Sequence, residues 1–391
     1  MRFSHLSDCH IGSWKDPKLR QLNLDSFKKA IEISIKERVG FVIIAGDLFD
    51  TALPQIEMVR EVADVLSQLK EEDIPVYLIP GSHDFSFAGK TMIDVLEHAG
   101  LVENVWKVTN DELEITLDKT GIKLAGFVGR KGGLERYEYG RVDFSKVEQE
   151  QGRKIFVFHT LLEEMKEGSF DKIDCPSIRV LPKGFNYYAG GHPHFIKTKQ
   201  IEGYGLVAYP GPTFPNNVEE LEELGNGGFF IVEMNETITP RHIPIKLKEV
   251  VKIKLNADNK SISDLEAELN IYKGDVVDKI VVVRIEGTVK EGKPVDLKVR
   301  KIFEYAFSVL VNVAKFVSKE TEVVEVTSQR IEDIESELMK KNKSNKLENE
   351  EELIKKLLEI LDVEKQDGER VADFEDRVRK QGAVVLGVKD E

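Results

Sequence analysis

Short apolar runs that end at a glycine or a polar residue organise the first 210 residues of the chain. The clearest run spans residues 41–45 and is followed directly by Gly46 and Asp47. A continuous apolar run of this length is typical of a strand buried on both faces, as in a sheet covered by helices. Similar runs occupy residues 2–7, 74–80, 154–158 and 185–189. The polar residues after each run are expected at the carboxyl end of a strand, where open α/β sheets place ligands.

Amphipathic segments lie between the first three of these runs and after the third. Residues 22–37 and 54–70 carry apolar stripes at helical spacing, and residues 91–98 carry a shorter one. This alternation predicts a parallel sheet with right-handed crossovers. Further strands are expected at residues 114–116 and 122–128, and strands of a second sheet at 205–209 and 228–233.

The pattern changes after residue 242. Residues 243–330 predict a small separate α/β domain, with strands at 250–255, 279–286 and 309–316 and helices at 261–269 and 295–307. Residues 331–352 are polar and predict a flexible linker. Two amphipathic helices are expected within residues 353–391, and they cannot bury their apolar stripes alone. The expected domains are therefore 1–242, 243–330 and a tail that docks on a partner.

Composition constrains the class of protein. A chain of 391 residues is too long to fold around a single hydrophobic core. Two cysteines form no disulfide framework, and no apolar run is long enough to span a bilayer, so a cytoplasmic protein is expected. The net charge of −14 repels phosphate, so a nucleic-acid binder would need a local basic or metal-bearing surface. By itself, composition favours an acidic enzyme of small substrates.

The polar residues at the strand ends are mostly Asp and His. They are Asp8, His10, Asp47, Ser82, His83, Asp84, His159, His192 and His194. Carboxylate oxygens and imidazole nitrogens suit Mn²⁺, Fe²⁺ or Zn²⁺ better than Mg²⁺ alone. The Asp-x-His and His-x-His pairs each deliver two ligands to one place if the loop stays extended. A single Asp after a glycine is usually a turn residue, but five such motifs together predict a metal centre.

Asp8-x-His10, Gly46-Asp47-x-x-Asp50, Gly81-Ser82-His83-Asp84, His159 and Gly191-His192-x-His194 resemble, in order, the signature of calcineurin-type metallophosphoesterases. Within that superfamily the chain resembles the Mre-eleven/SbcD DNA double-strand-break repair nucleases of archaeal type. The resemblance implies a βαβ sandwich with a small capping domain. It also implies a helical tail that binds a Rad-fifty-type coiled-coil ATPase, and a homodimer formed by the helices at 55–70 and 90–99.

The resemblance also implies roles for the site residues. Two metal ions, Mn²⁺ with Mg²⁺ as an alternative, would lie about 3.5–4 Å apart. Asp8, His10 and His194 would hold the first ion and His159 and His192 the second, with Asp47 bridging both. His83 would act as a general acid or stabilise the transition state.

Two residues depart from the family pattern. The superfamily usually has Asn where this chain has Ser82, so Ser82 either binds the second metal directly, binds it through water, or leaves that site weak. Nucleases of this family often have His at the position of Asp50. We hypothesise that Asp50 orients His83 through a hydrogen bond and favours its charged form.

Other polar residues have a simpler expected role. Asp84 is expected to cap its turn, and Cys9 to be a packed thiol. His5 and His98 belong to no motif. Several basic residues could either lie on the solvated surface or contact DNA phosphates, and the sequence favours neither role. They are Lys15, Lys18, Arg20, Arg130 and Lys131.

The expected function is a Mn²⁺-dependent DNA nuclease, associated with the nucleoid, that processes broken ends with the ATPase. Family resemblance implies exonuclease action on duplex ends and endonuclease action on single strands or hairpins. One alternative is a metallophosphoesterase of small phosphodiesters or phosphoproteins. Another is a scaffold that binds DNA ends, in which Ser82 has weakened the second metal site.

Overall fold

A computed structural model of the chain describes residues 1–85, 91–130, 135–319, 350–363 and 371–386. The chain forms two compact units, Met1–Ser318 and Lys319–Glu391.

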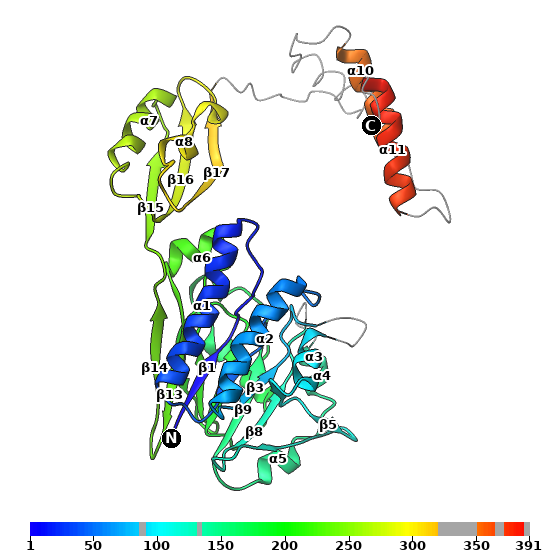
Figure 1. Cartoon of the computed structure of the whole chain (residues 1–391), viewed down its shortest axis with the longest axis vertical. Helices are drawn as coiled ribbons and strands as arrows, with labels where there is room; N and C mark the ends of the chain where they lie inside the picture. The colour runs from blue at the N-terminus through cyan, green and yellow to red at the C-terminus, as the bar shows by residue number, and fades with distance from the viewer. Residues whose placement is uncertain (86–90, 131–134, 320–349, 364–370, 387–391) are drawn as a thin grey trace. The chain divides into compact units, whose positions relative to one another are not determined.

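Two six-stranded sheets form the larger part of the first unit (Figure 1). The first sheet has the order β14 (Ile238–Ile245), β13 (Gly227–Met234), β1 (Arg2–Leu6), β2 (Val42–Ala45), β3 (Val76–Ile79) and β4 (Glu103–Asn104). The second has the order β11 (Lys197–Gln200), β12 (Leu206–Tyr209), β10 (Tyr187–Gly191), β9 (Lys154–His159), β8 (Lys123–Phe127) and β7 (Thr116–Leu117). The strands β1 to β4 are parallel, as are β8, β9, β10 and β12. This arrangement confirms the predicted α/β sandwich.

Alternate residues of each central strand face different cores, which explains the continuous apolar runs. In β2, Val42 and Ile44 pack against the helices α1 (Pro17–Lys36), α2 (Ile56–Glu71) and α3 (Met92–His98). Ile43 and Ala45 pack instead between the two sheets. A third core covers the outer face of the second sheet, beside α4 (Glu135–Tyr139) and α5 (Ser145–Gln149). A strand buried on both faces has no solvent side on which polar residues could alternate.

The prediction for residues 228–233 was wrong in one respect. This segment lies in β13, which belongs to the first sheet and pairs antiparallel with β1. Phe229 faces the helix-covered core while Phe230 faces the core between the sheets. Local sequence shows that such a strand is buried on both faces, but it does not show which sheet edge the strand covers. Residues 114–116 were also misplaced, because the strands lie at β6 (Glu112–Leu113), which pairs with β5 (Val108–Thr109), and at β7.

A three-stranded parallel sheet completes the first unit. Its strands are β15 (Val250–Asn256), β16 (Ile280–Val289) and β17 (Ser308–Ser318), with β16 in the centre and α7 (Ile262–Ile271) between β15 and β16 in sequence. The helix expected at 295–307 is reduced to a 3-10 turn at Pro294–Asp296 and to α8 (Val299–Ile302). Val299 and Phe303, in and next to α8, are buried together with Leu265 and Leu269 of α7, while Val295 is exposed.

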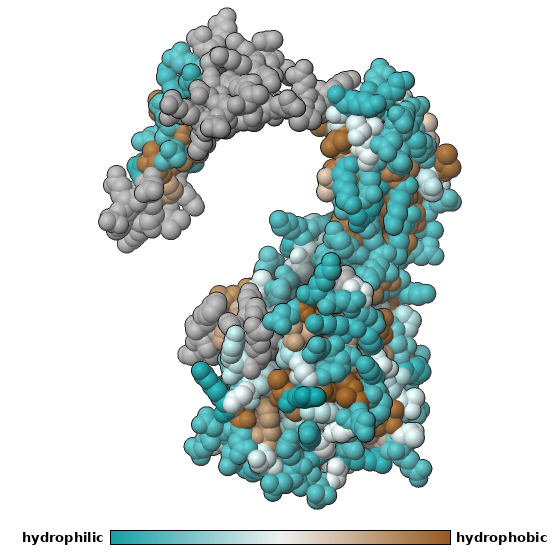
Figure 2. All heavy atoms as spheres, turned by 180° about the vertical axis from the view of Figure 1, so that it is seen from behind, coloured by the Kyte–Doolittle hydropathy of each residue, from teal (hydrophilic) through white to brown (hydrophobic). Residues whose placement is uncertain are grey.

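The second unit contains two helices, α10 (Glu350–Leu361) and α11 (Val371–Leu386). Both expected tail helices are therefore confirmed, and α10 already includes residues 350–352 of the expected linker. Residues 331–349 of that linker lie outside the described residues. No helix in the described part of the chain is long and apolar enough to cross a membrane. The face drawn in Figure 2 is mainly hydrophilic, with hydrophobic side chains in small groups.

Candidate metal centre

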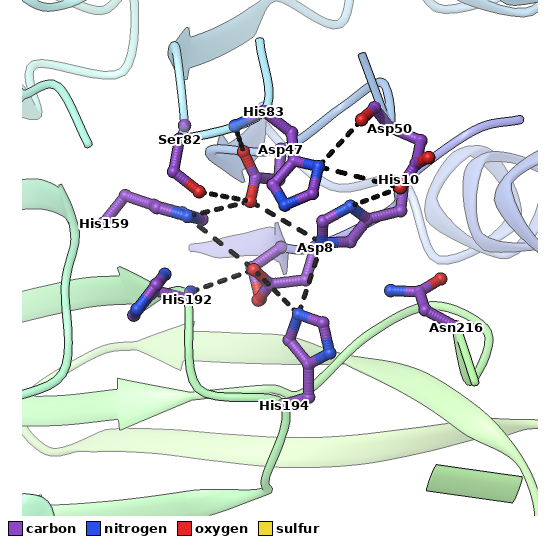
Figure 3. A network of polar contacts seen from close by, with 12 residues as sticks. Asp8, His10, Asp47, Asp50, Ser82, His83, His159, His192, His194 and Asn216 are labelled. Atoms are coloured by element: carbon purple, nitrogen blue, oxygen red, sulfur yellow. Dashed lines mark hydrogen bonds and ion pairs between the residues drawn. The ribbon is translucent and has the colours of Figure 1, made fainter. Parts of the chain in front are cut away.

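The carboxyl ends of five strands, from both sheets, meet at one place (Figure 3). Asp8 and His10 follow β1, Asp47 follows β2, and Ser82 follows β3 in the first sheet. From the second sheet, His159 ends β9, and His192 and His194 follow β10. The two sheets thus present carboxylates and imidazoles to each other, as expected for ligands at the ends of parallel strands.

The loops that carry these residues are not extended. The φ angles of Asp8, His10, Asp47 and His192 are 50°, 42°, 52° and 95°. Hydrogen bonds between the first two loops hold this shape, including His10 N–H to Asp47 O at 2.9 Å. The expected extended Asp-x-His geometry was therefore wrong, although Asp8 and His10 still converge. Residues in sparsely populated backbone regions cluster at functional sites.

One group of possible ligands consists of Asp8, His10 and His194. The Nε2 atoms of His10 and His194 lie 3.2 Å apart, and His194 Nε2 lies 3.7 Å from Asp8 Oδ1. Donor atoms this close together match the spacing of ligands around one ion, because metal–ligand distances are about 2.0–2.2 Å. The Nδ1 atom of His194 faces the carboxylate of Glu220 at 2.8 Å.

A second group consists of Asp8, Asp47 and His159, all of which are buried. His159 Nε2 lies 3.1 Å from Asp47 Oδ2, and His10 Nε2 lies 3.6 Å from the same oxygen. His159 Nδ1 donates to Ala45 O at 2.8 Å, since a carbonyl can only accept. Asp8 therefore belongs to both groups, and Asp47 of the second group also faces His10 of the first.

Charges are concentrated at this place. Burial alone would raise the pKa of Asp47, but the facing His159 and His10 rings and the His83 N–H outweigh it and hold that pKa well below its usual range. Burial would likewise lower the pKa of His159, but Asp47 and Asp8 outweigh it and raise that pKa. Asp47 is thus an anion at any ordinary pH, in a site with almost no solvent exposure.

Three buried polar atoms of these residues have no hydrogen-bond partner among the described residues: Asp8 Oδ2, His10 Nδ1 and His159 Nε2. A buried polar atom without a partner costs roughly 1–3 kcal/mol. A divalent cation would take up Asp8 Oδ2 and His159 Nε2 as ligands. The site therefore fits a metal on the evidence of its donor atoms, and their chemistry fits Mn²⁺, Fe²⁺ or Zn²⁺.

Residues 1–195 match the protein family described as calcineurin-like phosphoesterase. The chain carries a calcineurin-like phosphoesterase domain. All the possible metal ligands lie within the matched residues.

Similarity to known proteins extends over more residues than this domain. The DNA double-strand break repair protein Mre11 of Archaeoglobus fulgidus is 25% identical over 288 residues, which are 68% of this chain and 63% of the relative. The protein of that name from Sulfurisphaera tokodaii is 31% identical over 276 residues, which are 65% of both chains. The chain thus covers less than two thirds of the length of either relative. A solved dimetal phosphatase from Danio rerio covers 63% of this chain at 13% identity and a TM-score of 0.42, a similarity too distant to bear on function.

Two expected ligands of the phosphoesterase domain are placed differently from the rest. The His192 side chain is solvent-exposed, and its ring centroid lies 5.2 Å from that of His159 (Figure 3). Its backbone N–H donates to Asp8 Oδ1 at 2.9 Å. Ser82 is buried, and its hydroxyl donates to Asp47 Oδ2 at 3.3 Å. His192 thus lies beside His159 without belonging to any of the metal-ready groups found among the described residues, whereas Ser82 contacts the Asp47 carboxylate.

The contact between His83 and Asp50 differs from the hypothesis drawn from the sequence. His83 Nδ1 bonds to the backbone carbonyl of Asp50 at 2.7 Å, whereas the Asp50 carboxylate is 3.7 Å from that nitrogen. The carboxylate lies nearer to His10 Nδ1, at 3.3 Å. The backbone carbonyl of Asp50 therefore orients His83, and the Asp50 carboxylate lies between the rings of His10 and His83.

Several simpler expectations are confirmed. Asp84 accepts hydrogen bonds from the N–H groups of Leu48, Phe49 and Gly81, so it fixes the turn. The Cys9 thiol is buried and is no member of the metal-ready groups found among the described residues. His5 is buried beside Tyr187.

The basic residues make contacts within the chain. Lys18 donates to Phe307 O, Arg20 donates to Trp14 O, and Arg130 pairs with Glu138. Lys131 lies outside the described residues. None of these contacts tests the expected binding of DNA phosphates.

Sequence reasoning missed Glu220. It lies on α6 (Val218–Glu223), beyond the last motif, and its carboxylate bonds the Nδ1 of His194. Three other glutamates surround it, at 219, 222 and 223. Nothing in the local pattern distinguishes the one that reaches the centre.

Proposed function

We propose that the chain is a Mn²⁺-dependent DNA nuclease that processes double-strand breaks together with a Rad-fifty-type ATPase. The observation that carries this proposal is the convergence of Asp8, His10, Asp47, His159 and His194 in a phosphoesterase domain. The curated relatives are named DNA double-strand break repair proteins, which favours DNA over other phosphodiesters.

In this proposal Asp8, His10 and His194 would hold one ion, and His159 and His192 would hold a second. Asp47 would contribute to both sets of ligands, because its Oδ2 faces His159 and His10 at 3.1 and 3.6 Å. Ser82 supports the second ion through its hydroxyl next to Asp47. Bound divalent ions supply positive charge to the phosphate oxygens and lower the pKa of a coordinated water.

His83 would provide the general acid. Its Nδ1 must carry a proton to donate to the Asp50 carbonyl, which leaves Nε2 as the atom that exchanges a proton with the substrate. The His83 side chain is 42% exposed while the neighbouring His10 side chain is only 4% exposed. His83 therefore lies where a substrate would enter, with its ring centroid 4.6 Å from that of His10.

Exposed apolar surface supports the proposed partners. Leu53, Ile56 and Val95, next to or on α2 and α3, are 80%, 70% and 55% exposed and favour a homodimer through these helices. On α10, Leu358 and Leu361 are 41% and 68% exposed. These residues favour docking of the tail on the ATPase partner.

Labelled duplex and hairpin DNA incubated with Mn²⁺ test the proposal, with wild type and His83→Ala compared. We expect wild type to cleave both substrates and His83→Ala to lose at least about 100-fold in rate while it still binds Mn²⁺. His98→Ala is the matched control, because His98 is exposed and, among the described residues, its side chain hydrogen-bonds only to Asp94 O of its own helix. Its rate should equal that of wild type.

Two other outcomes would contradict the nuclease. Cleavage of a p-nitrophenyl phosphodiester without cleavage of DNA would favour a phosphoesterase of small substrates. Binding of DNA ends without cleavage, at low Mn²⁺ occupancy, would favour a scaffold whose second metal site is weakened at Ser82.

A further inference from the structure

We propose that Glu220 is a positioning residue for His194, and that the three-stranded domain of residues 250–318 holds it in place through α6. This inference rests on the proposed metal centre and adds a connection to it. The small domain would then help to set the affinity of the centre for metal, although it supplies no ligand.

The first step is the contact between Glu220 and His194. Glu220 Oε1 lies 2.8 Å from His194 Nδ1. A carboxylate with this geometry accepts, so Nδ1 carries the hydrogen and Nε2 is left with its lone pair. That Nε2 faces His10 Nε2 and Asp8 Oδ1. A ligating histidine is commonly fixed in this way by a carboxylate on its other nitrogen.

The second step is the rigidity of the Glu220 carboxylate. Its Oε2 accepts from Asn216 N–H at 2.8 Å, and its Oε1 also accepts from Asn217 Nδ2 at 2.6 Å. Asn217 in turn caps α6, because its side-chain oxygen accepts from Glu220 N–H at 2.8 Å. The side chain and backbone of Glu220 are thus held by the same turn, so any shift of α6 shifts the acceptor of His194.

The third step links α6 to the small domain. Arg284 on β16 forms two contacts with the carboxylate of Glu222, one of them Nε to Oε1 at 3.0 Å. A bidentate pair fixes orientation as well as distance. The side chains of Arg284 and Glu222 are only 25% and 14% exposed, so solvent screens this pair less than a surface pair.

Apolar packing joins the same two elements. Leu221 is fully buried in a cluster with Trp14, Ile280 and Val282, the last two from β16. Three successive residues of α6 therefore have different tasks. Glu220 faces the metal ligand, Leu221 fills the core shared with the small domain, and Glu222 binds Arg284.

The first experiment measures binding of Mn²⁺ to metal-free full-length protein by calorimetry, for wild type, Glu220→Ala, Glu220→Gln and Glu223→Gln. We expect Glu220→Ala to bind about 10–100-fold more weakly, as for the loss of such partners elsewhere. Glu220→Gln should bind with intermediate affinity, because its amide oxygen still accepts from Nδ1. Glu223→Gln is the matched control from the exposed end of the same helix, and its affinity should be unchanged.

The second experiment tests the link to the small domain by charge reversal. Arg284→Glu and Glu222→Arg should each weaken Mn²⁺ binding several-fold, and the double variant should recover most of the loss. Thermal unfolding of the metal-free variants checks that each one folds. Recovery in the double variant would exclude a general loss of structure.

Wild-type affinity in Glu220→Ala would overturn the positioning role, and wild-type affinity in Arg284→Glu would overturn the role of the small domain. Either result would leave the proposed nuclease intact, provided that wild type binds Mn²⁺ and cleaves DNA. Failure of wild type itself to bind Mn²⁺ would instead reject the metal centre on which the inference rests.

Discussion

The four buried or half-buried histidines that face the centre all turn the same nitrogen towards it. His159, His194 and His83 each bond an acceptor through Nδ1, namely Ala45 O, Glu220 Oε1 and Asp50 O. The Nδ1 of His10 faces the Asp50 carboxylate at 3.3 Å. In all four cases Nε2 remains for a metal or a substrate, and for His159, His194 and His83 the hydrogen bond at Nδ1 selects the tautomer.

Replacement of Asp50 by Asn tests whether its carboxylate acts on His10 or on His83. The carboxylate is nearer to His10 than to His83, and the bond to His83 comes from the main chain. We therefore expect Asp50→Asn to weaken Mn²⁺ binding roughly tenfold, measured by calorimetry on the metal-free protein. Unchanged affinity with a reduced cleavage rate would support the original hypothesis, in which Asp50 acts on His83.

His5 predicts a dependence of stability on pH. Burial lowers the pKa of His5 to about 3, against the opposing effect of a hydrogen bond from the imidazole to the backbone of Gly190. The unfolded chain, with a pKa of about 6.5, binds a proton below that pH while the folded chain stays neutral at this residue, so stability falls as pH falls. Between pH 7.5 and 5.5 the loss from this group should be about 1.4 kcal/mol.

Urea unfolding in EDTA at these two pH values measures the effect. His5→Gln should reduce the loss of stability between pH 7.5 and 5.5 by that amount. The exposed His98→Gln is the control and should leave the loss as in wild type. An equal pH dependence in all three proteins would show that His5 does not stay neutral in the fold.

At the scale of elements, glycines allow the strand ends of the two sheets to meet. A Cβ on Gly46, after β2, would lie 2.3 Å from His159 Nδ1 at the end of β9. A Cβ on Gly81, after β3, would lie 2.2 Å from Asp47 Oδ1. A Cβ on Gly191, at the end of β10, would lie 2.1 Å from Ala45 O. The ligands converge because these positions carry no side chain.

Gly46→Ala should push apart the ends of β2 and β9 and destabilise the fold. The added methyl group should cost roughly 1–3 kcal/mol from overpacking, beyond the cost of placing alanine at positive φ. Gly121→Ala is the matched control, since its φ of 83° is close to the 86° of Gly46 and nothing lies within 4 Å of its Cβ. Denaturant unfolding of the two variants isolates the packing cost. Equal stability of the two variants would contradict the proposed role of Gly46.

At the scale of the whole molecule, the converging residues of the candidate metal centre all belong to the unit Met1–Ser318. Among the described residues, the helices α10 and α11 of the other unit supply none of these side chains. In the proposed function the chemistry and the binding of the ATPase are therefore carried by different units.

Deletion of residues 346–391 tests this division. Metal-dependent cleavage should remain largely intact, and association with the ATPase partner should be lost, as measured by size-exclusion chromatography of the mixed proteins. Leu353→Glu combined with Leu357→Glu in the full chain should also abolish association, because it puts charges on the apolar stripe of α10. Persistent association in both variants would place the partner surface elsewhere.

The sequence by itself determined the central strands β1, β2, β3, β9 and β10, because a short apolar run that ends at a polar residue is typical of a strand buried on both faces. It also placed Asp8, His10, Asp47, His159 and His194 at strand ends, since each follows or ends such a run. Only the tertiary structure decided which atoms meet there. The pairing of β13 with β1, the main-chain bond to His83 and the contact of Glu220 with His194 all join residues distant in sequence or depend on a loop conformation. No local pattern encodes such a contact, because its energy arises only once the separate elements have packed together.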